Sequence, residues 1–167
     1  TLIALKRVHH GLSTGALLST GAGQDFRLIM ANEFRWLASL RHPNIISVLD
    51  YGFDVEQQPF YTMELLESAS TIIEAGRNLT LQARVALLAQ MFQALHYLHH
   101  RGIVHHDLKP SNVLVQGEHV KVLDFGLSVA LDSAVEATGT AGTLSYMAPE
   151  LFSGGRPNPA SDLYSAG

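Results

Sequence analysis

Apolar and polar positions alternate in ways that predict short strands early in the chain and helices later. Residues 1–8 have strand character, and I-I-S-V-L-D-Y-G-F (45–53) and P-F-Y-T-M-E-L-L (59–66) predict two more strands. Between the first two strands, apolar residues three and four positions apart predict a helix over 25–40. R-H-P-N (41–44) ends that helix, because the residue before a proline is biased out of the helical region.

The clearest helical pattern begins after Thr80, a residue type that caps helix N-termini, and ends at Arg101 and Gly102. Its apolar residues recur at helical spacing, which predicts that they share one buried face: Leu81, Val85, Leu88, Phe92, Leu95 and Leu98. E-H-V-K-V-L-D-F-G (118–126) predicts a short strand and a turn, and A-S-D-L-Y-S-A-G (160–167) predicts a helix that begins there.

Composition narrows the class of protein. With 167 residues, 47% hydrophobic and 16% charged, the chain is one domain or a large piece of one, with enough apolar material for a core. The net charge of -4 predicts no nucleic-acid partner, and the lack of cysteine excludes disulfides and thiolate metal sites. No apolar run reaches the roughly 18 residues of a membrane span, and no signal peptide opens the sequence. We therefore expect a soluble, cytoplasmic segment without a membrane partner.

The stretch I-V-H-H-D-L-K-P-S-N-V-L-V (103–115) places many polar groups between two apolar flanks, where each needs a partner or a function. Asp107 is suited to accept a proton from a hydroxyl nucleophile, and Lys109 to neutralise phosphate charge. The oxygen atoms of Asn112 and of Asp124, which follows a predicted strand, are ligands of the kind that Mg²⁺ prefers. The stretch therefore predicts a catalytic loop with a shared metal.

Glu33 falls on the apolar stripe of the helix predicted over 25–40, between Ile29 and Leu37. A carboxylate there must find a cation or be neutralised, and Lys6 on the first strand is one candidate. The alternative interpretation is a surface glutamate at the edge of the helix.

Four short motifs occur in order: I-A-L-K (3–6), H-H-D-L-K-P-S-N (105–112), D-F-G (124–126) and A-P-E (148–150). Together they resemble the signature set of protein kinases. The resemblance implies an α+β, two-lobed fold, truncated at both ends. A partial small lobe would span 1–63, a hinge 64–68, and the first part of the larger lobe 69–167. It also implies transfer of the γ-phosphoryl group of ATP, with Mg²⁺, to serine or threonine hydroxyls of a protein substrate.

The resemblance assigns roles to matching positions. Lys6 would contact the α- and β-phosphates and pair with Glu33. Asp107 would be the catalytic base, with Asn112 and Asp124 as Mg²⁺ ligands. The position of Lys109 is similar to that in the serine/threonine branch. Further implied residues are Met63 as gatekeeper, the Glu64 and Leu66 backbone at the adenine edge, Ala4 and Leu114 on the two faces of adenine, Thr143 beside Asp107 and Lys109, Thr138 and Thr140 in the activation segment, and Asp162 supporting the catalytic loop.

Three features depart from the kinase pattern. His106 stands where arginine is usual, so a phosphorylated activation segment would meet a weaker, pH-dependent cation. No G-x-G-x-x-G precedes Lys6, and the sequence stops within the helix of Asp162. We therefore expect an internal fragment of a longer polypeptide, inactive by itself.

Two other interpretations stay open. One is a pseudokinase or scaffold module of the same fold, which the presence of Lys6, Asp107, Asn112 and Asp124 disfavours. The other is a metal phosphohydrolase based on the double histidine, which Pro110 and the strand-like flanks disfavour. His99 and His100 are expected to be solvated residues at a helix end.

Overall fold

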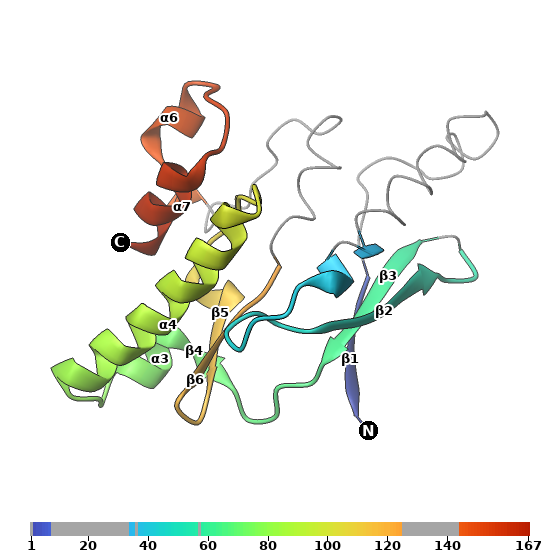
Figure 1. Ribbon diagram of the computed structural model, residues 1–167, viewed down its shortest axis with the longest axis horizontal. Helices are drawn as coiled ribbons and strands as arrows, with labels where there is room; N and C mark the ends of the chain where they lie inside the picture. The colour runs from blue at the N-terminus through green and yellow to red at the C-terminus, as the bar shows by residue number, and fades with distance from the viewer. Residues whose placement is uncertain (1, 8–33, 36, 57, 125–143) are drawn as a thin grey trace. The chain divides into compact units, whose positions relative to one another are not determined.

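The computed structural model describes residues 2–7, 34–35, 37–56, 58–124 and 144–167 (Figure 1). They form two compact units, and each is presented by itself. The first comprises the described residues of Thr1–Arg41 and of Ser47–Leu65. The second comprises His42–Ile46 and the described residues from Leu66 onward.

The first unit is an antiparallel sheet of β1 (Ile3–Arg7), β2 (Val48–Phe53) and β3 (Pro59–Glu64), in the order β1-β3-β2. Lys6 pairs with Tyr61, which in turn pairs with Tyr51 on β2. Phe34 is buried beside the sheet, with its ring centroid 5.2 Å from that of Tyr51 and 5.8 Å from that of Tyr61. All three strands predicted for this part of the chain are therefore present, with shorter bounds.

The second unit is organised around α4 (Leu81–His100). The Thr80 side chain accepts a hydrogen bond from Ala83 N, and Gly102 follows the helix with a φ of 73°, so both predicted ends are confirmed. The predicted buried face is only partly right. The buried residues are Leu87, Met91, Ala94, Leu95 and Leu98, whereas Leu81, Val85, Leu88 and Phe92 are exposed.

A second small sheet packs beside α4 in the order β4-β5-β6, built from β4 (Ser70–Thr71), β5 (Val113–Gln116) and β6 (His119–Val122). The remaining elements are short: α3 (Ile72–Gly76), the 3₁₀ turn η1 (Pro110–Asn112), α6 (Pro149–Phe152) and α7 (Pro159–Ala166). The predicted strand at 118–126 and helix at 160–167 correspond to β6 and α7. The sequence patterns did not predict β4, α3 or α6.

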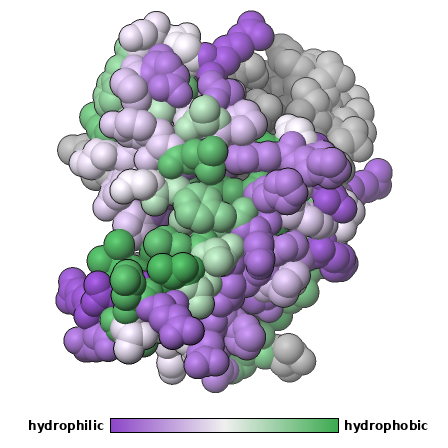
Figure 2. Space-filling model, turned by 60° about the vertical axis from the view of Figure 1, so that its left-hand side comes forward, coloured by the Kyte–Doolittle hydropathy of each residue, from purple (hydrophilic) through white to green (hydrophobic). Residues whose placement is uncertain are grey.

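A groove of about 570 Å³ runs along α4 in the second unit. Its walls are mainly apolar and include Ile72, Leu88, Met91, Leu108 and Val113. Hydrophobic side chains also gather on the face that Figure 2 brings forward. Among the described residues, no helix has both the length and the apolar character that crossing a bilayer requires.

Candidate active site

The β5–β6 hairpin brings Asn112 and Asp124 next to each other. The two strands are antiparallel, with Val113 opposite Val122, and the N–H of Leu123 donates to the carbonyl oxygen of Asn112 over 2.9 Å. Asn112 ends η1 immediately before β5, and Asp124 lies two residues after β6. The two side chains that the sequence predicts as metal ligands are thus carried by the two ends of one hairpin.

The Asp107 carboxylate is held through one of its two oxygen atoms. Lys109 Nζ lies 2.7 Å from Asp107 Oδ2, and Asn112 Nδ2 donates to the same oxygen over 3.1 Å. Asn112 Nδ2 also donates to the Asp107 carbonyl oxygen over 2.8 Å. The other carboxylate oxygen, Oδ1, is buried and has no hydrogen-bond partner in the part of the chain that the structure describes. Oδ1 is therefore the carboxylate oxygen that can accept a hydrogen bond from a hydroxyl group.

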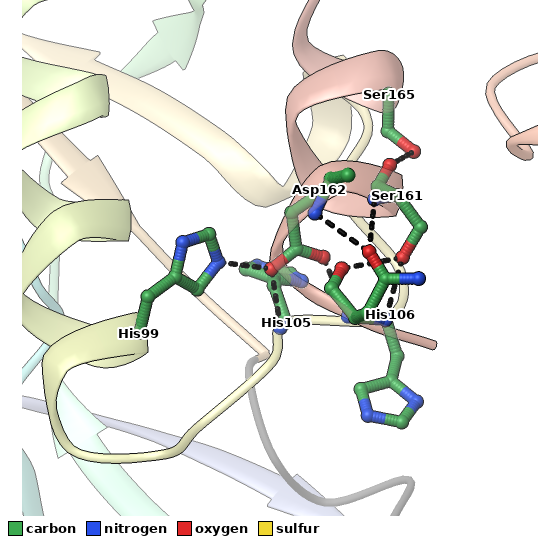
Figure 3. Close-up of polar contacts among 8 residues, drawn as sticks. His99, His105, His106, Ser161, Asp162 and Ser165 are labelled. Atoms are coloured by element: carbon green, nitrogen blue, oxygen red, sulfur yellow. Dashed lines mark hydrogen bonds and ion pairs between the residues drawn. The ribbon is translucent and has the colours of Figure 1, made fainter. Parts of the chain in front are cut away.

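Asp162 on α7 fixes the backbone that leads into Asp107 (Figure 3). Its side chain is 2% exposed and accepts hydrogen bonds from two consecutive N–H groups. The His105 N–H donates to Oδ2 over 2.8 Å, and the His106 N–H donates to Oδ1 over 3.1 Å. The role that the resemblance gives to Asp162 therefore matches the geometry, because its carboxylate binds the backbone of the two residues that precede Asp107.

His99 belongs to the candidate site through its contact with Asp162, and the sequence interpretation missed it. We expected a solvated residue at the helix end, but the His99 side chain is only 15% exposed, and its Nε2 lies 2.7 Å from Asp162 Oδ2 (Figure 3). The spacing of residues along α4 could have indicated this burial. Met91, Leu95 and His99 follow each other at intervals of four residues, which places His99 on the buried face of the helix. The expectation of solvation holds for His100, which is exposed.

His105 is completely buried, and burial lowers the pKa of its imidazole below the usual value despite the nearby carboxylates of Asp162, Asp107 and Asp124. Its Nε2 lies 2.9 Å from the carbonyl oxygen of Leu123. A carbonyl oxygen can only accept, so Nε2 carries the proton of the neutral ring. This bond connects the start of the catalytic loop to the residue before Asp124.

Two residues of the candidate site have strained backbone conformations. Among the described residues, three non-glycine residues have a positive φ: Ser68 at 56°, His106 at 71° and Asp124 at 61°. Such a conformation costs roughly 1–2 kcal/mol for a residue with a side chain and persists only where the surroundings enforce it. The hydrogen bond from the His106 N–H to Asp162 enforces the positive φ of His106. The strain thus marks both segments that carry the proposed acid–base and metal-binding groups.

The other predicted residues are distributed over both units. Ala4 and Lys6 lie on β1, where Ala4 pairs with Met63 on β3. Glu64 ends β3, and its N–H donates to the carbonyl oxygen of Ser47, so the sheet uses that donor. Leu66 and Leu114 belong to the second unit. Four predicted residues lie outside the described residues: Glu33, the expected partner of Lys6, and Thr138, Thr140 and Thr143 of the activation segment.

The metal phosphohydrolase interpretation gains no support from side-chain grouping. Within the described ranges, no set of three or more histidine, cysteine, aspartate or glutamate side chains is arranged to hold a metal ion. His105 and His106 instead take part in the contacts that shape the catalytic loop, through their N–H groups and the buried His105 ring.

Comparison with known proteins agrees with this geometry. The family model described as protein kinase domain matches residues 19–167. The chain is 40% identical over 144 residues to the serine/threonine-protein kinase PknA of Mycobacterium tuberculosis, an alignment covering 81% of the chain and 33% of PknA. It is 32% identical over 172 residues to the serine/threonine-protein kinase PknB of Mycobacterium leprae, covering 96% of the chain and 28% of PknB. The chain thus spans about a third or less of these curated relatives.

A solved structure shows the same fold. The crystal structure of Rad53 residues 1–466 in complex with AMP-PNP aligns with a TM-score of 0.70 and 26% identity, covering 98% of this chain and 38% of the Rad53 chain. The α+β kinase fold implied by the four motifs is therefore confirmed. Since the family model matches most of the chain, and the four kinase motifs occur in it in order, the chain belongs to the protein kinase family.

Proposed function

We propose that this chain carries the catalytic centre of a serine/threonine protein kinase, which transfers the γ-phosphoryl group of ATP to a protein hydroxyl. The observation that supports this proposal most is that the two carboxylate oxygens of Asp107 have different surroundings. Lys109 and Asn112 bind one carboxylate oxygen, and the buried second oxygen has no hydrogen-bond partner among the described residues. A carboxylate prepared in this way can orient a substrate hydroxyl and accept its proton.

Lys109 serves two functions in this proposal. It holds Asp107 Oδ2 at 2.7 Å in the described structure, and its ammonium group can neutralise the charge of a phosphoryl group that approaches the same carboxylate. Phosphoryl transfer passes through a loose transition state, in which positioning and charge neutralisation do most of the catalytic work. The loop therefore needs rigid placement more than an unusual reactive group, and Asp162 provides that placement.

The donor set at the hairpin fits Mg²⁺. Carboxylate and amide oxygen atoms are hard ligands, and Asp124 and Asn112 each supply one. The Asn112 amide has a defined orientation, because its Nδ2 donates twice to Asp107, which turns its oxygen away from that residue. When bound, Mg²⁺ would neutralise the charge of the ATP phosphates. The residues of this chain would hold it and keep the proton acceptor in place beside it.

Serine and threonine are the proposed acceptors because of Lys109, and because PknA and PknB, the relatives described above, are named serine/threonine-protein kinases. ATP as the donor implies a cytoplasmic location.

The pseudokinase alternative predicts nucleotide binding without turnover. It is disfavoured because the groups that a kinase needs at Asp107, Lys109, Asn112 and Asp124 occur together.

The test is phosphoryl transfer by the full-length protein from [γ-³²P]ATP to a mixture of seryl, threonyl and tyrosyl peptides. Asp107→Asn should lower kcat by at least about 10²–10⁴, the usual loss for a general base, with ATP affinity nearly unchanged. The proposal is supported if the wild type phosphorylates seryl or threonyl peptides and the Asp107→Asn variant does not. ATP binding without turnover by the wild type would establish the pseudokinase, and turnover that persists in Asp107→Asn would exclude Asp107 as the base.

A further inference from the structure

The last two turns of α4 carry a pair of histidines outside the catalytic loop. His96 and His100 are four residues apart and both are exposed, so their rings project from the same side of the helix. The ring centroids lie 6.2 Å apart with an interplanar angle of 24°. Two histidines at this spacing on a helix are a recurrent arrangement for binding one transition-metal ion.

The groove beside this pair has about 590 Å³ and is open to solvent ions. It is lined by His42, Ala89, Phe92, Gln93, His96, Tyr97, His100 and Arg101. Two of these residues are already used by contacts with their neighbours. The His42 Nδ1 accepts a hydrogen bond from Asn44 N over 3.1 Å, and the Arg101 guanidinium lies 3.8 Å from the centroid of the Tyr97 ring. The other polar groups that line the groove are the imidazoles of His96 and His100, the amide of Gln93 and the hydroxyl of Tyr97.

We propose that His96 and His100 supply two imidazole ligands to a borderline transition-metal ion, with water completing the coordination sphere. Neutral imidazole suits Cu²⁺, Ni²⁺ and Zn²⁺, and the usual order of stability places Cu²⁺ above Ni²⁺ and Zn²⁺. Metal–nitrogen distances of about 2.0–2.1 Å place two ligand nitrogens roughly 3 Å apart. Exposed side chains change rotamer within nanoseconds, so rotation about the side-chain bonds of the two histidines can bring their ring nitrogens to this distance.

This site differs in chemistry from the hairpin of Asn112 and Asp124. The residues that line its groove offer nitrogen ligands and no carboxylate, so the site is poorly suited to Mg²⁺. The Arg101 charge nearby lowers the affinity for any cation, and we expect the site to bind reversibly. A bound ion would link the last two turns of α4, the same segment from which His99 contacts Asp162.

Isothermal titration of the full-length protein with Ni²⁺, in the presence of excess Mg²⁺ to fill hard-ligand sites, tests the proposal. His96→Ala and His100→Ala should each reduce the affinity by at least about 10- to 100-fold, the loss that even an outer-shell partner causes. His119→Ala is the matched control, because His119 is also exposed but lies on β6. Cu²⁺ electron paramagnetic resonance should report two nitrogen ligands in the wild type and one in each of the two α4 variants.

Gln93→His gives a test that does not depend on a loss. It places a third imidazole in the same groove and should tighten Ni²⁺ binding at least about tenfold if an ion lies there. The proposal is overturned if the wild type binds no Ni²⁺ at millimolar concentration, or if the two α4 variants titrate like the wild type. It is equally overturned if His119→Ala removes the binding while both α4 variants keep it.

Discussion

At the scale of single residues, the geometry of the candidate active site depends on one buried carboxylate, that of Asp162. Asp162 accepts hydrogen bonds from the N–H groups of His105 and His106 and contacts the ring of His99, while its side chain is 2% exposed. A buried carboxylate is stable only if its oxygen atoms are satisfied. The three contacts stabilise Asp162, and in return Asp162 holds His106 at its strained φ of 71°.

Removing the His99 contact should therefore affect the catalytic loop from a distance. His99→Phe leaves Asp162 with two donors, and we expect the free energy of unfolding to fall by about 1.5–3 kcal/mol, the value of a hydrogen bond to a charged group. Because His99 acts through Asp162, kcat should fall while KM for ATP changes little. Urea unfolding and steady-state kinetics measure the two effects. His99→Gln, which restores an N–H donor, should recover part of both, and His119→Gln should change neither. Equal stability of the phenylalanine variant and the wild type would contradict this role.

His42 gives the molecule a dependence of stability on pH. Burial lowers the pKa of its imidazole, and the positive charges of Arg101 and Lys121 lower it further. The Nδ1 atom accepts a hydrogen bond from Asn44 N, which requires the unprotonated form. The unfolded chain therefore binds the proton more readily than the folded one, so the contribution of His42 is complete above pH about 6.5 and is lost as the pH falls below that value.

The variant His42→Asn should remove this dependence and keep the bond, because an asparagine oxygen accepts from the N–H two residues on. The stability difference between wild type and variant should shift in favour of the variant between about pH 7 and about pH 5. Urea titrations at several pH values measure it. Buried His105 contributes a slope of the same sign, so a residual pH dependence in the variant is expected. A difference that stays constant over this range would contradict the assignment to His42.

At the scale of elements, Gln90 connects three segments of the second unit. Its Oε1 accepts from Asn44 Nδ2 over 2.9 Å and from Val120 N over 3.0 Å, and its Nε2 donates to the Glu118 carbonyl oxygen over 2.9 Å. One side chain on α4 thus binds both the segment before β2 and the hairpin that carries Asn112 and Asp124.

We expect Gln90→Leu to destabilise the protein by about 1–3 kcal/mol, because the N–H of the fully buried Val120 loses its acceptor. The same change at Gln82, which is exposed on the first turn of α4, should stay within about 0.5 kcal/mol. Chemical unfolding of the two variants gives the comparison. If Gln90→Leu were as stable as Gln82→Leu, the three hydrogen bonds would contribute nothing net.

The elements that were predicted correctly carry local signals. The ends of α4 could be predicted because Thr80 and Gly102 act within one turn of the helix. Elements of two to five residues, such as β4, α3 and α6, contain too few positions to show a period. The buried face of α4 was predicted only in part, since apolar residues occupy two of its faces, and periodicity does not say which face is covered.

In the candidate site, the grouping of Asp107, Lys109 and Asn112 followed from a short motif, and the structure shows their contacts. The contact of His99 with Asp162 joins residues 63 positions apart, and no local pattern encodes such a pair. The burial of His105 depends in the same way on Leu123 and Asp162, which reach it only after folding.

At the scale of the whole molecule, α4 presents a continuous apolar stripe to solvent. Leu81 is 78% exposed, Val85 55%, Leu88 40% and Phe92 40%, and these residues follow each other at intervals of three or four. The stripe lies beside the apolar groove along α4, and Figure 2 shows hydrophobic side chains gathered on this face. Contiguous apolar patches of this kind promote association between molecules, whereas single exposed apolar residues do not.

The isolated 167-residue chain is therefore expected to self-associate and to bind apolar dyes. Leu81→Glu combined with Val85→Lys should reduce both without loss of stability, because the pair creates a favourable i, i+4 contact worth about 0.2–0.5 kcal/mol on α4. Val55→Lys is the control: Val55 is 96% exposed but lies in the β2–β3 turn, away from the stripe. Sedimentation velocity and dye fluorescence over a range of concentrations measure the effect. Equal self-association of the double variant and the wild type would show that the α4 stripe is not the surface through which the chains associate.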